Sequence, residues 1–150
     1  MDFAGPERII TFVTEHLPDA IIETADEASG APEIAWGDTF VYTRPNERMP
    51  FATIVTKDYP GFDTESELDR PGVFRLNIGV GKAWFTELLG YPPAEHPHHA
   101  AEFDYTAFDQ LLPHPVYAIQ AWVSFVNPGP ATSELAASLL KERGSRGTSR

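Results

Sequence analysis

Hydrophobic and polar positions alternate most clearly between residues 73 and 80. One set of alternate positions is apolar and consists of Phe74, Leu76, Ile78 and Val80. Arg75 and Asn77 occupy positions between them. Because successive side chains of a strand point to opposite faces of a sheet, this segment predicts a strand with one apolar face and one polar face.

Four other segments carry β-branched and aromatic residues in short runs bounded by turn residues, which is typical of strands. Strands are predicted over residues 20–24, 34–43, 50–57 and 116–127. The last of these is the longest. One face of it holds Val116, Ala118, Gln120, Trp122, Ser124 and Val126. Loops are predicted over residues 44–48, 58–72 and 91–103, and the second of these is long and acidic.

Apolar residues at helical spacing occur near both ends of the chain. A helix is predicted over residues 6–17, with Pro6 at its first position, and a final helix is predicted after Thr132 or Ser133 as its cap. Two shorter helices are predicted. One spans residues 82–89 and ends at Gly90, and the other begins at Asp104 and extends to residue 112.

This order of elements predicts the fold class. Strands joined by turns, with helices at both ends, are typical of a single α+β domain with a largely antiparallel sheet. We expect the domain to span residues 1–150, with the N- and C-terminal helices packed on one face of the sheet. The residues from about 144 to 150 are predicted to form a frayed basic tail.

Composition and charge remove several functional classes. The chain has 150 residues, no cysteine and a formal net charge of −11. Disulfides, thiolate metal sites and cysteine nucleophiles are therefore excluded. The first residues lack a signal peptide pattern, and the apolar runs are far shorter than the roughly 20 residues that span a bilayer. We therefore expect a cytoplasmic protein that does not contact membranes. Its acidic charge makes nucleic acid an unfavourable partner.

The polar strand face gives the first candidate site. If strands 73–80 and 116–127 are neighbours, Arg75 and Asn77 lie beside Gln120 and Trp122. Arg75 would bind a carboxylate or phosphate, and the two amides would orient polar groups of a ligand. Trp122 would provide a flat apolar contact. The alternative is a solvated sheet face on which Arg75 pairs with an acid such as Asp69.

A second candidate is His114, which lies between two prolines. A positioned imidazole works as a general acid or base near neutral pH. The alternative is a histidine held in a rigid turn. Asp69 and Arg70 precede a Pro-Gly pair, and they have two interpretations as well. They form either a charged pair in the site or an anchor for the loop.

The histidine-rich loop suggests a metal site. Gly90, His96, His98 and Glu102 follow the spacing of the first half of a cupin metal motif, and these side chains suit a divalent metal. The second half of that motif is absent, and Pro97 disfavours the central strand it requires. A polar loop is the alternative, so no metal is assigned. The residues for which metal binding is left open are His96, His98, His99 and Glu102.

Long segments of the chain carry a family resemblance. These segments are WGDTF (36–40), PFATIVTKD (50–58), LDRPGVFRLNIGVG (68–81) and PHPVYAIQAWVSFVNP (113–128). They resemble an actinobacterial family named domain of unknown function 6194, from about Trp36 to the final helix. The resemblance implies no known activity.

The order of elements is more distantly similar to the MmcQ/YjbR-like proteins. The shared features are a Trp-Gly strand, a strand like FATIV, a late tryptophan strand and a C-terminal helix. This likeness implies a double-wing, CyaY-like fold, although the block at 73–81 departs from the pattern. Members of that group have been called DNA-binding, a role that the acidic charge of this chain disfavours.

Together these observations predict a small-molecule-binding protein. It is either an enzyme that uses acid–base chemistry in a pocket of polar and aromatic side chains, without an organic cofactor, or a non-catalytic binding or interaction module. The catalytic candidates are His114, Arg75 and Asn77. The substrate-binding candidates are Gln120, Trp122, Trp36, Asp69 and Arg70. The ligand and reaction stay open, and so does the formation of a homodimer.

Overall fold

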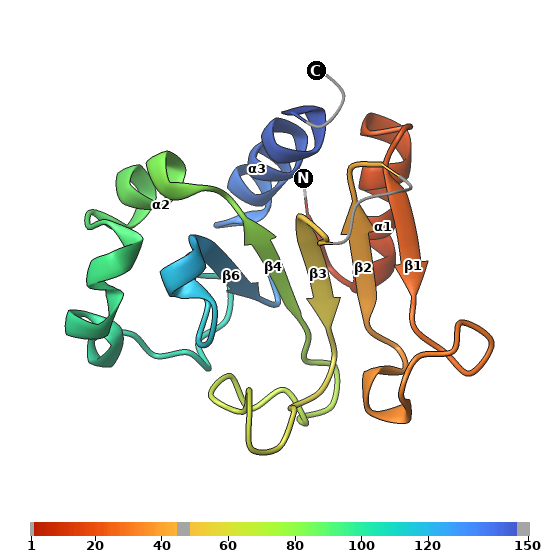
Figure 1. Cartoon of the computed structure of the whole chain (residues 1–150), viewed down its shortest axis with the longest axis horizontal. Coiled ribbons are helices and arrows are strands. Elements are labelled where there is room, and N and C mark those ends of the chain that lie inside the picture. Colours follow the sequence, from red (N-terminus) through yellow and green to blue (C-terminus); the bar gives the residue numbers. More distant parts are fainter. Residues whose placement is uncertain (1, 45–48, 147–150) are drawn as a thin grey trace.

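The computed structural model of the chain describes residues 2–44 and 49–146, and a six-stranded sheet lies at its centre (Figure 1). The strand order is β1-β2-β3-β4-β6-β5, and every neighbouring pair is antiparallel. The strands are β1 (Ile21–Thr24), β2 (Thr39–Tyr42), β3 (Ala52–Val55), β4 (Arg75–Gly79), β5 (Leu112–Pro113) and β6 (Trp122–Val126). The α-helices are α1 (Pro6–His16), α2 (Lys82–Leu89) and α3 (Ser133–Arg146). The 3₁₀ helices are η1 (Glu33–Ala35), η2 (Pro93–His98), η3 (Ala100–Glu102) and η4 (Ala118–Gln120).

One face of the sheet is covered by α1 and α3, which lie behind it in Figure 1. We call it the helix face. Its fully buried strand residues include Ile54, Leu76, Ile78, Val123 and Phe125. The helices add apolar side chains because helical spacing places them on one side of each helix. These are Ile9, Phe12, Val13, Ala136, Leu139 and Leu140. The α+β prediction, with both terminal helices on one face, is therefore confirmed.

The segment before α1 meets the start of α3 in this layer. The backbone N–H of Phe3 donates to Oγ of Ser133 at 3.0 Å, although 130 positions separate them in the sequence. Phe3 is buried and its ring packs edge-on against Phe12. The start of the chain is thus attached to the first turn of α3.

The other face of the sheet carries Thr53, Arg75, Asn77, Trp122 and Ser124, and we call it the polar face. The register places these residues side by side, because Asn77 pairs with both Thr53 and Ser124. Part of this face is covered by the segment 58–73, which packs a second small apolar cluster against it. That cluster consists of Val55, Leu68, Val73, Leu112 and Val126.

Several predicted elements are confirmed with small shifts at their ends. The helix predicted over 82–89 has the bounds of α2, and Gly90 ends it in the left-handed conformation, at φ 86°. The predicted alternation in 73–80 is confirmed by β4. The loop at 58–72 holds no helix and no strand of the sheet, and Tyr59 and Asp63 form an isolated bridge in it.

The long strand predicted over 116–127 is wrong in its first half. Residues 118–120 form η4, Ala121 is left-handed at φ 68°, and β6 begins at Trp122. Ala118 is buried from within this turn, which imitates the pattern of a strand. Gln120 therefore lies on the exposed surface of η4 and does not share a strand face with Trp122.

The short helix predicted over 104–112 is also wrong. Asp104 accepts a hydrogen bond from the N–H of Thr106 and closes a turn, not a helix. Asp109 has φ 56°, which a continuing helix does not allow. Its carboxylate instead accepts the N–H groups of Gly129, Ala131 and Thr132 and fixes the entry to α3.

Two predictions extend beyond the described residues. Most of the loop predicted at 44–48, namely residues 45–48, lies outside them, and so do residues 147–150 of the predicted basic tail. The helix α3 extends to Arg146. Gly144 within it is buried where α3 meets Leu17 and Phe51.

Candidate functional site

Arg75 is the centre of a hydrogen-bonded network on the polar face. Its side chain is 1% exposed, although arginine is rarely buried without partners. The two terminal nitrogens donate to the two carboxylate oxygens of Asp63, at 3.1 and 2.5 Å. Nη1 also donates to Oγ of Ser66 at 3.0 Å, and Nε donates to Oδ1 of Asn77 at 2.8 Å. The guanidinium is thus held in one plane and one orientation.

Asn77 connects Arg75 to the neighbouring strands. Its Oδ1 accepts the hydroxyl of Ser124 at 2.7 Å, and its Nδ2 donates to Oγ1 of Thr53 at 3.0 Å. Asn77 and Ser124 are each 1% exposed. The network therefore spans β3, β4 and β6 and forms a rigid polar floor.

His114 lies against this floor, directly after β5, with an exposed fraction of 3%. Its Nδ1 accepts the backbone N–H groups of Val116 and Tyr117, both at 2.9 Å. An Nδ1 that accepts hydrogen bonds carries no hydrogen, so the neutral ring holds its hydrogen on Nε2. Burial, and then the charge of Arg75, hold the pKa of His114 well below its usual value. The ring is therefore neutral at pH 7.

The hydrogen on Nε2 of His114 has a specific consequence. Nε2 lies 3.5 Å from Nη2 of Arg75. Both atoms carry N–H groups, so neither accepts from the other. Two buried donor groups from different segments therefore lie next to each other.

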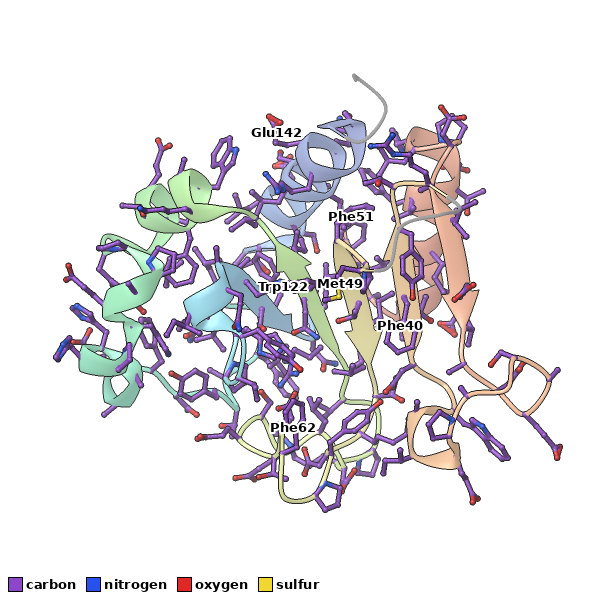
Figure 2. The ribbon with its side chains drawn as sticks, in the orientation of Figure 1. Phe40, Met49, Phe51, Phe62, Trp122 and Glu142 are labelled. Atoms are coloured by element: carbon purple, nitrogen blue, oxygen red, sulfur yellow. The ribbon has the colours of Figure 1, made fainter. Side chains whose placement is uncertain are left out.

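Aromatic side chains surround this place. The ring of Tyr117 lies 5.0 Å from that of His114, and Phe62 lies 5.9 Å from Tyr117, as ring centroid distances. Trp122 is half-buried and meets His114 edge-on at 6.3 Å. It lies over Gly79, where an added Cβ would come within 2.8 Å of its ring. Figure 2 shows Phe62 on the segment below this face and Trp122 on β6.

The structure brings four of the predicted site residues together, namely Arg75, Asn77, His114 and Trp122. It does not bring Gln120, Trp36, Asp69 and Arg70 to them. The Trp36 indole donates to the carbonyl of Ala31 at 3.0 Å.

Asp69 and Arg70 anchor their loop, and Arg70 also reaches beyond it, since its Nη2 lies 3.5 Å from the carbonyl oxygen of Thr106 and its guanidinium lies over the ring of Phe108. The Asp69 carboxylate accepts the N–H of Asp58, and Arg70 donates to the carbonyls of Ser66 and Glu67. These contacts correspond to the loop-anchoring interpretation of the pair. The acid paired with Arg75 is Asp63, and not Asp69.

Sequence reasoning missed Asp63, Ser66, Thr53 and Ser124. Thr53 and Ser124 had a usable signal, because each lies at the polar alternate position of a strand that pairs with β4. Asp63 and Ser66 had none, because the 58–72 segment holds several acids and hydroxyls without a periodic pattern.

A polar cluster fixes the start of the 58–72 segment. Asp38 is fully buried and accepts hydrogen bonds from the hydroxyl of Tyr59, the N–H of Thr56 and Nζ of Lys57. Burial, followed by hydrogen bonding to Asp38, raises the pKa of the Tyr59 phenol. This cluster holds Tyr59 in place while the chain turns towards Arg75.

In the histidine-rich loop, the aromatic ring of Tyr91 contacts two histidine side chains. The Tyr91 hydroxyl lies 2.8 Å from Nδ1 of His96, and His99 stacks on Tyr91 with ring centroids 3.9 Å apart. Nδ1 of His99 also lies 2.9 Å from the Glu102 carboxylate. Burial raises the pKa of Tyr91 to about 12, while burial and then His99 lower that of His96. Among the described residues, no group of three or more histidine or acidic side chains is arranged to hold a metal ion.

A surface depression lies along the outer side of α1, and its lining includes Phe3, Arg8 and Phe12. None of the predicted site residues lines it.

No helix in the described part of the chain has the length and apolar character needed to cross a membrane.

Comparison with known proteins gives one match. The model of a family of unknown function, DUF6194, matches residues 3–150. No curated protein and no solved structure matches the chain. The match covers nearly the whole chain, so the site described above lies inside the matched residues.

Proposed function

The chain belongs to the DUF6194 family, and we propose that it is a small-molecule-binding protein whose ligand places an acceptor oxygen between Arg75 and His114. One observation carries the proposal. Nη2 of Arg75 and Nε2 of His114 belong to buried side chains and lie 3.5 Å apart. A carboxylate, phosphate or amide oxygen accepts both bonds at once.

The surroundings favour a ligand with a flat apolar part. Tyr117 is 40% exposed and Phe62 is 57% exposed, so their rings border the site from the solvent side. Binding sites for small molecules combine aromatic walls with a few fixed polar groups. An aromatic or unsaturated acid or amide satisfies both requirements.

In this proposal His114 is a hydrogen-bond donor. A general base needs a free lone pair within reach of the substrate proton. The Nδ1 lone pair of His114 is already shared by the N–H groups of Val116 and Tyr117, and Nε2 carries a hydrogen. An enzymatic version of the proposal therefore uses His114 to polarise a substrate oxygen, not to remove a proton. Cytoplasmic location is part of the proposal, since the sequence has no cysteine.

The test is a titration of ¹⁵N-labelled protein with benzoate and with benzamide, followed by NMR. We expect at least one probe to shift the signals of His114 Nε2 and of the Arg75 guanidinium. His114→Asn keeps an acceptor for the two backbone N–H groups and removes the Nε2 donor. It should weaken binding about tenfold, the value of one buried hydrogen bond.

Gln120→Ala is the control for this titration, because Gln120 is exposed on η4 and lies outside the network. It should bind the probes as the wild type does. The proposal is wrong if neither probe moves the two side-chain signals at millimolar concentration.

An interaction module is the second candidate, and exposed apolar side chains favour it. Phe62 and Ile119 are 57% and 54% exposed and lie on segments joined by the Phe62–Tyr117 contact. Such residues support association when they gather on a surface. Sedimentation of wild type and Phe62→Ser measures self-association. A homodimer that dissociates in the variant favours this candidate.

Double-wing DNA binding, proposed from the YjbR-like order of elements, is the least favoured candidate. The net charge of −11 opposes contact with a phosphate backbone. A shift of duplex DNA at low salt, reversed by moderate salt, would support it.

A further inference from the structure

We infer that Asp63 is an internal substitute for an anionic ligand, and that a carboxylate or phosphate displaces it from Arg75 on binding. This inference rests on the proposed function and adds the charge of the ligand and the way the site opens. The turn formed by residues 59–63 then moves away from β4 as the ligand enters.

The geometry of the Asp63 contact is that of a bound ligand. Its two oxygens meet the two terminal nitrogens of Arg75 one to one, at 3.1 and 2.5 Å. Arginine binds free carboxylates and phosphates through this same fork. An incoming anion can therefore take over both bonds without any change in the guanidinium, which Asn77 holds through Nε.

The charge of the ligand decides whether Asp63 must leave Arg75 before the ligand binds. While Asp63 is in place, it neutralises Arg75 in surroundings where both are nearly dry. A second anion beside this pair would meet the carboxylate at close range and lose more by desolvation than it gains. A neutral amide oxygen does not meet that repulsion. An anion that replaces Asp63 gains the full charge of Arg75 and also the Nε2 donor of His114.

The segment that carries Asp63 is built to move as a unit. Residues 59–63 close on themselves, because the N–H groups of Phe62 and Asp63 both bond to the carbonyl of Tyr59. Gly61 supplies the left-handed residue of the turn, at φ 77°. Phe62 is 57% exposed, so little apolar surface holds the tip. Segments with few buried apolar contacts are the first to open.

Both ends of this segment are attached elsewhere. On one side Tyr59 bonds to Asp38, and on the other Arg70 holds the carbonyl of Ser66 while Leu68 is 1% exposed. The tip can therefore leave Arg75 without unfolding the flanking residues. Phe62, which touches Tyr117, moves with it and uncovers the side of the site nearest to His114.

The experiment compares wild type, Asp63→Asn and the matched control Glu65→Gln, which removes one negative charge from an exposed position of the same segment. The probes are benzoate, inorganic phosphate and benzamide. We expect benzoate or phosphate to bind Asp63→Asn at least tenfold more tightly than wild type, and benzamide to bind both equally. Glu65→Gln should bind all three probes as the wild type does. The anion that gains more identifies the ligand class.

A second measurement uses the wild type alone, so it holds even if Asp63→Asn does not fold. Saturating benzoate or phosphate should abolish the nuclear Overhauser contact between the Phe62 and Tyr117 rings, and benzamide should leave that contact unchanged. If the probes shift His114 while the contact between the Phe62 and Tyr117 rings persists and Asp63→Asn shows no gain for anions, displacement is wrong and the proposed function stands. If no probe shifts His114 in wild type or in Asp63→Asn, both are wrong.

Discussion

The two faces of β4 are equally buried and chemically opposite. Leu76 and Ile78 point to the helix face and are 0% exposed, while Arg75 and Asn77 point to the polar face and are 1% exposed. The helix face is held by packing, which has no preferred direction and is roughly proportional to the apolar area removed from water. The polar face is held by hydrogen bonds and an ion pair, each of which requires one partner atom in one direction.

This difference decides how each face responds to change. An apolar contact that is lost leaves a cavity, and neighbours relax into part of it. A polar partner that is lost leaves a buried group without a hydrogen bond or a counter-charge, which has no such relaxation. The polar face is therefore the less tolerant of the two, even though ion pairs add little stability of their own.

The largest expected effect comes from breaking the ion pair on one side. Asp63→Ala leaves the Arg75 guanidinium buried on the central strand β4 without its counter-charge, and we expect a loss of about 3–5 kcal/mol in the free energy of unfolding. Urea denaturation measures it. Replacing both partners, as Arg75→Met with Asp63→Leu, should recover most of that loss, since no uncompensated charge remains. A double variant as unstable as the single one would contradict this account.

The corresponding change on the helix face is Leu76→Ala. It removes a side chain with 0% exposure, and we expect a loss of about 3 kcal/mol from transfer and cavity terms. Leu76→Met keeps the volume and should cost less than about 1.5 kcal/mol. If Leu76→Ala is more damaging than Asp63→Ala, the ranking of the two faces is reversed.

The smallest effect is a dependence of stability on pH, to which the polar face contributes through His114. In the folded protein the pKa of His114 lies well below its usual value, so the ring stays neutral at mildly acidic pH. In the unfolded chain the same histidine takes up a proton near pH 6.5. Stability is therefore complete above pH 7 and falls as the pH drops below 6.5, by at most about 1.4 kcal/mol per pH unit.

Denaturation at pH 7.5, 6.5 and 5.5 measures this slope. His96 also has a lowered pKa and acts in the same direction, so the comparison is between wild type and His114→Asn. The variant should have the shallower slope. Equal slopes would show that His114 is protonated in the folded state.

Much of the helix face could be predicted from the sequence. The period-two pattern of residues 73–80 and the helical spacing in α1 depend on neighbours in the chain, and local geometry determines which side they point to. Gly90 marks the end of α2 in the sequence, because glycine readily adopts the left-handed conformation that ends a helix. The errors at 104–112 and 116–121 share one cause, since Asp109 and Ala121 adopt left-handed conformations that the tertiary structure imposes.

The polar face was predicted only in half. Arg75, Asn77, His114 and Trp122 were chosen from strand parity and from the prolines around His114. The acid that neutralises Arg75 could not be chosen, because contact between residues 63 and 75 depends on how an irregular segment folds back. Gln120 does not lie beside Trp122, because residues 118–120 form a 3₁₀ turn and not the strand that their sequence pattern predicts.

The bond between Phe3 and Ser133 affects how the chain acquires its fold during synthesis. The first helix leaves the ribosome with an apolar side whose partners in α3 are made about 120 positions later. The central strand β4 likewise lacks one of its two neighbouring strands until β6 is synthesised, about 50 residues later. The nascent chain therefore carries unpaired apolar surface until α3 has emerged, and a product truncated before α3 should aggregate instead of folding in part.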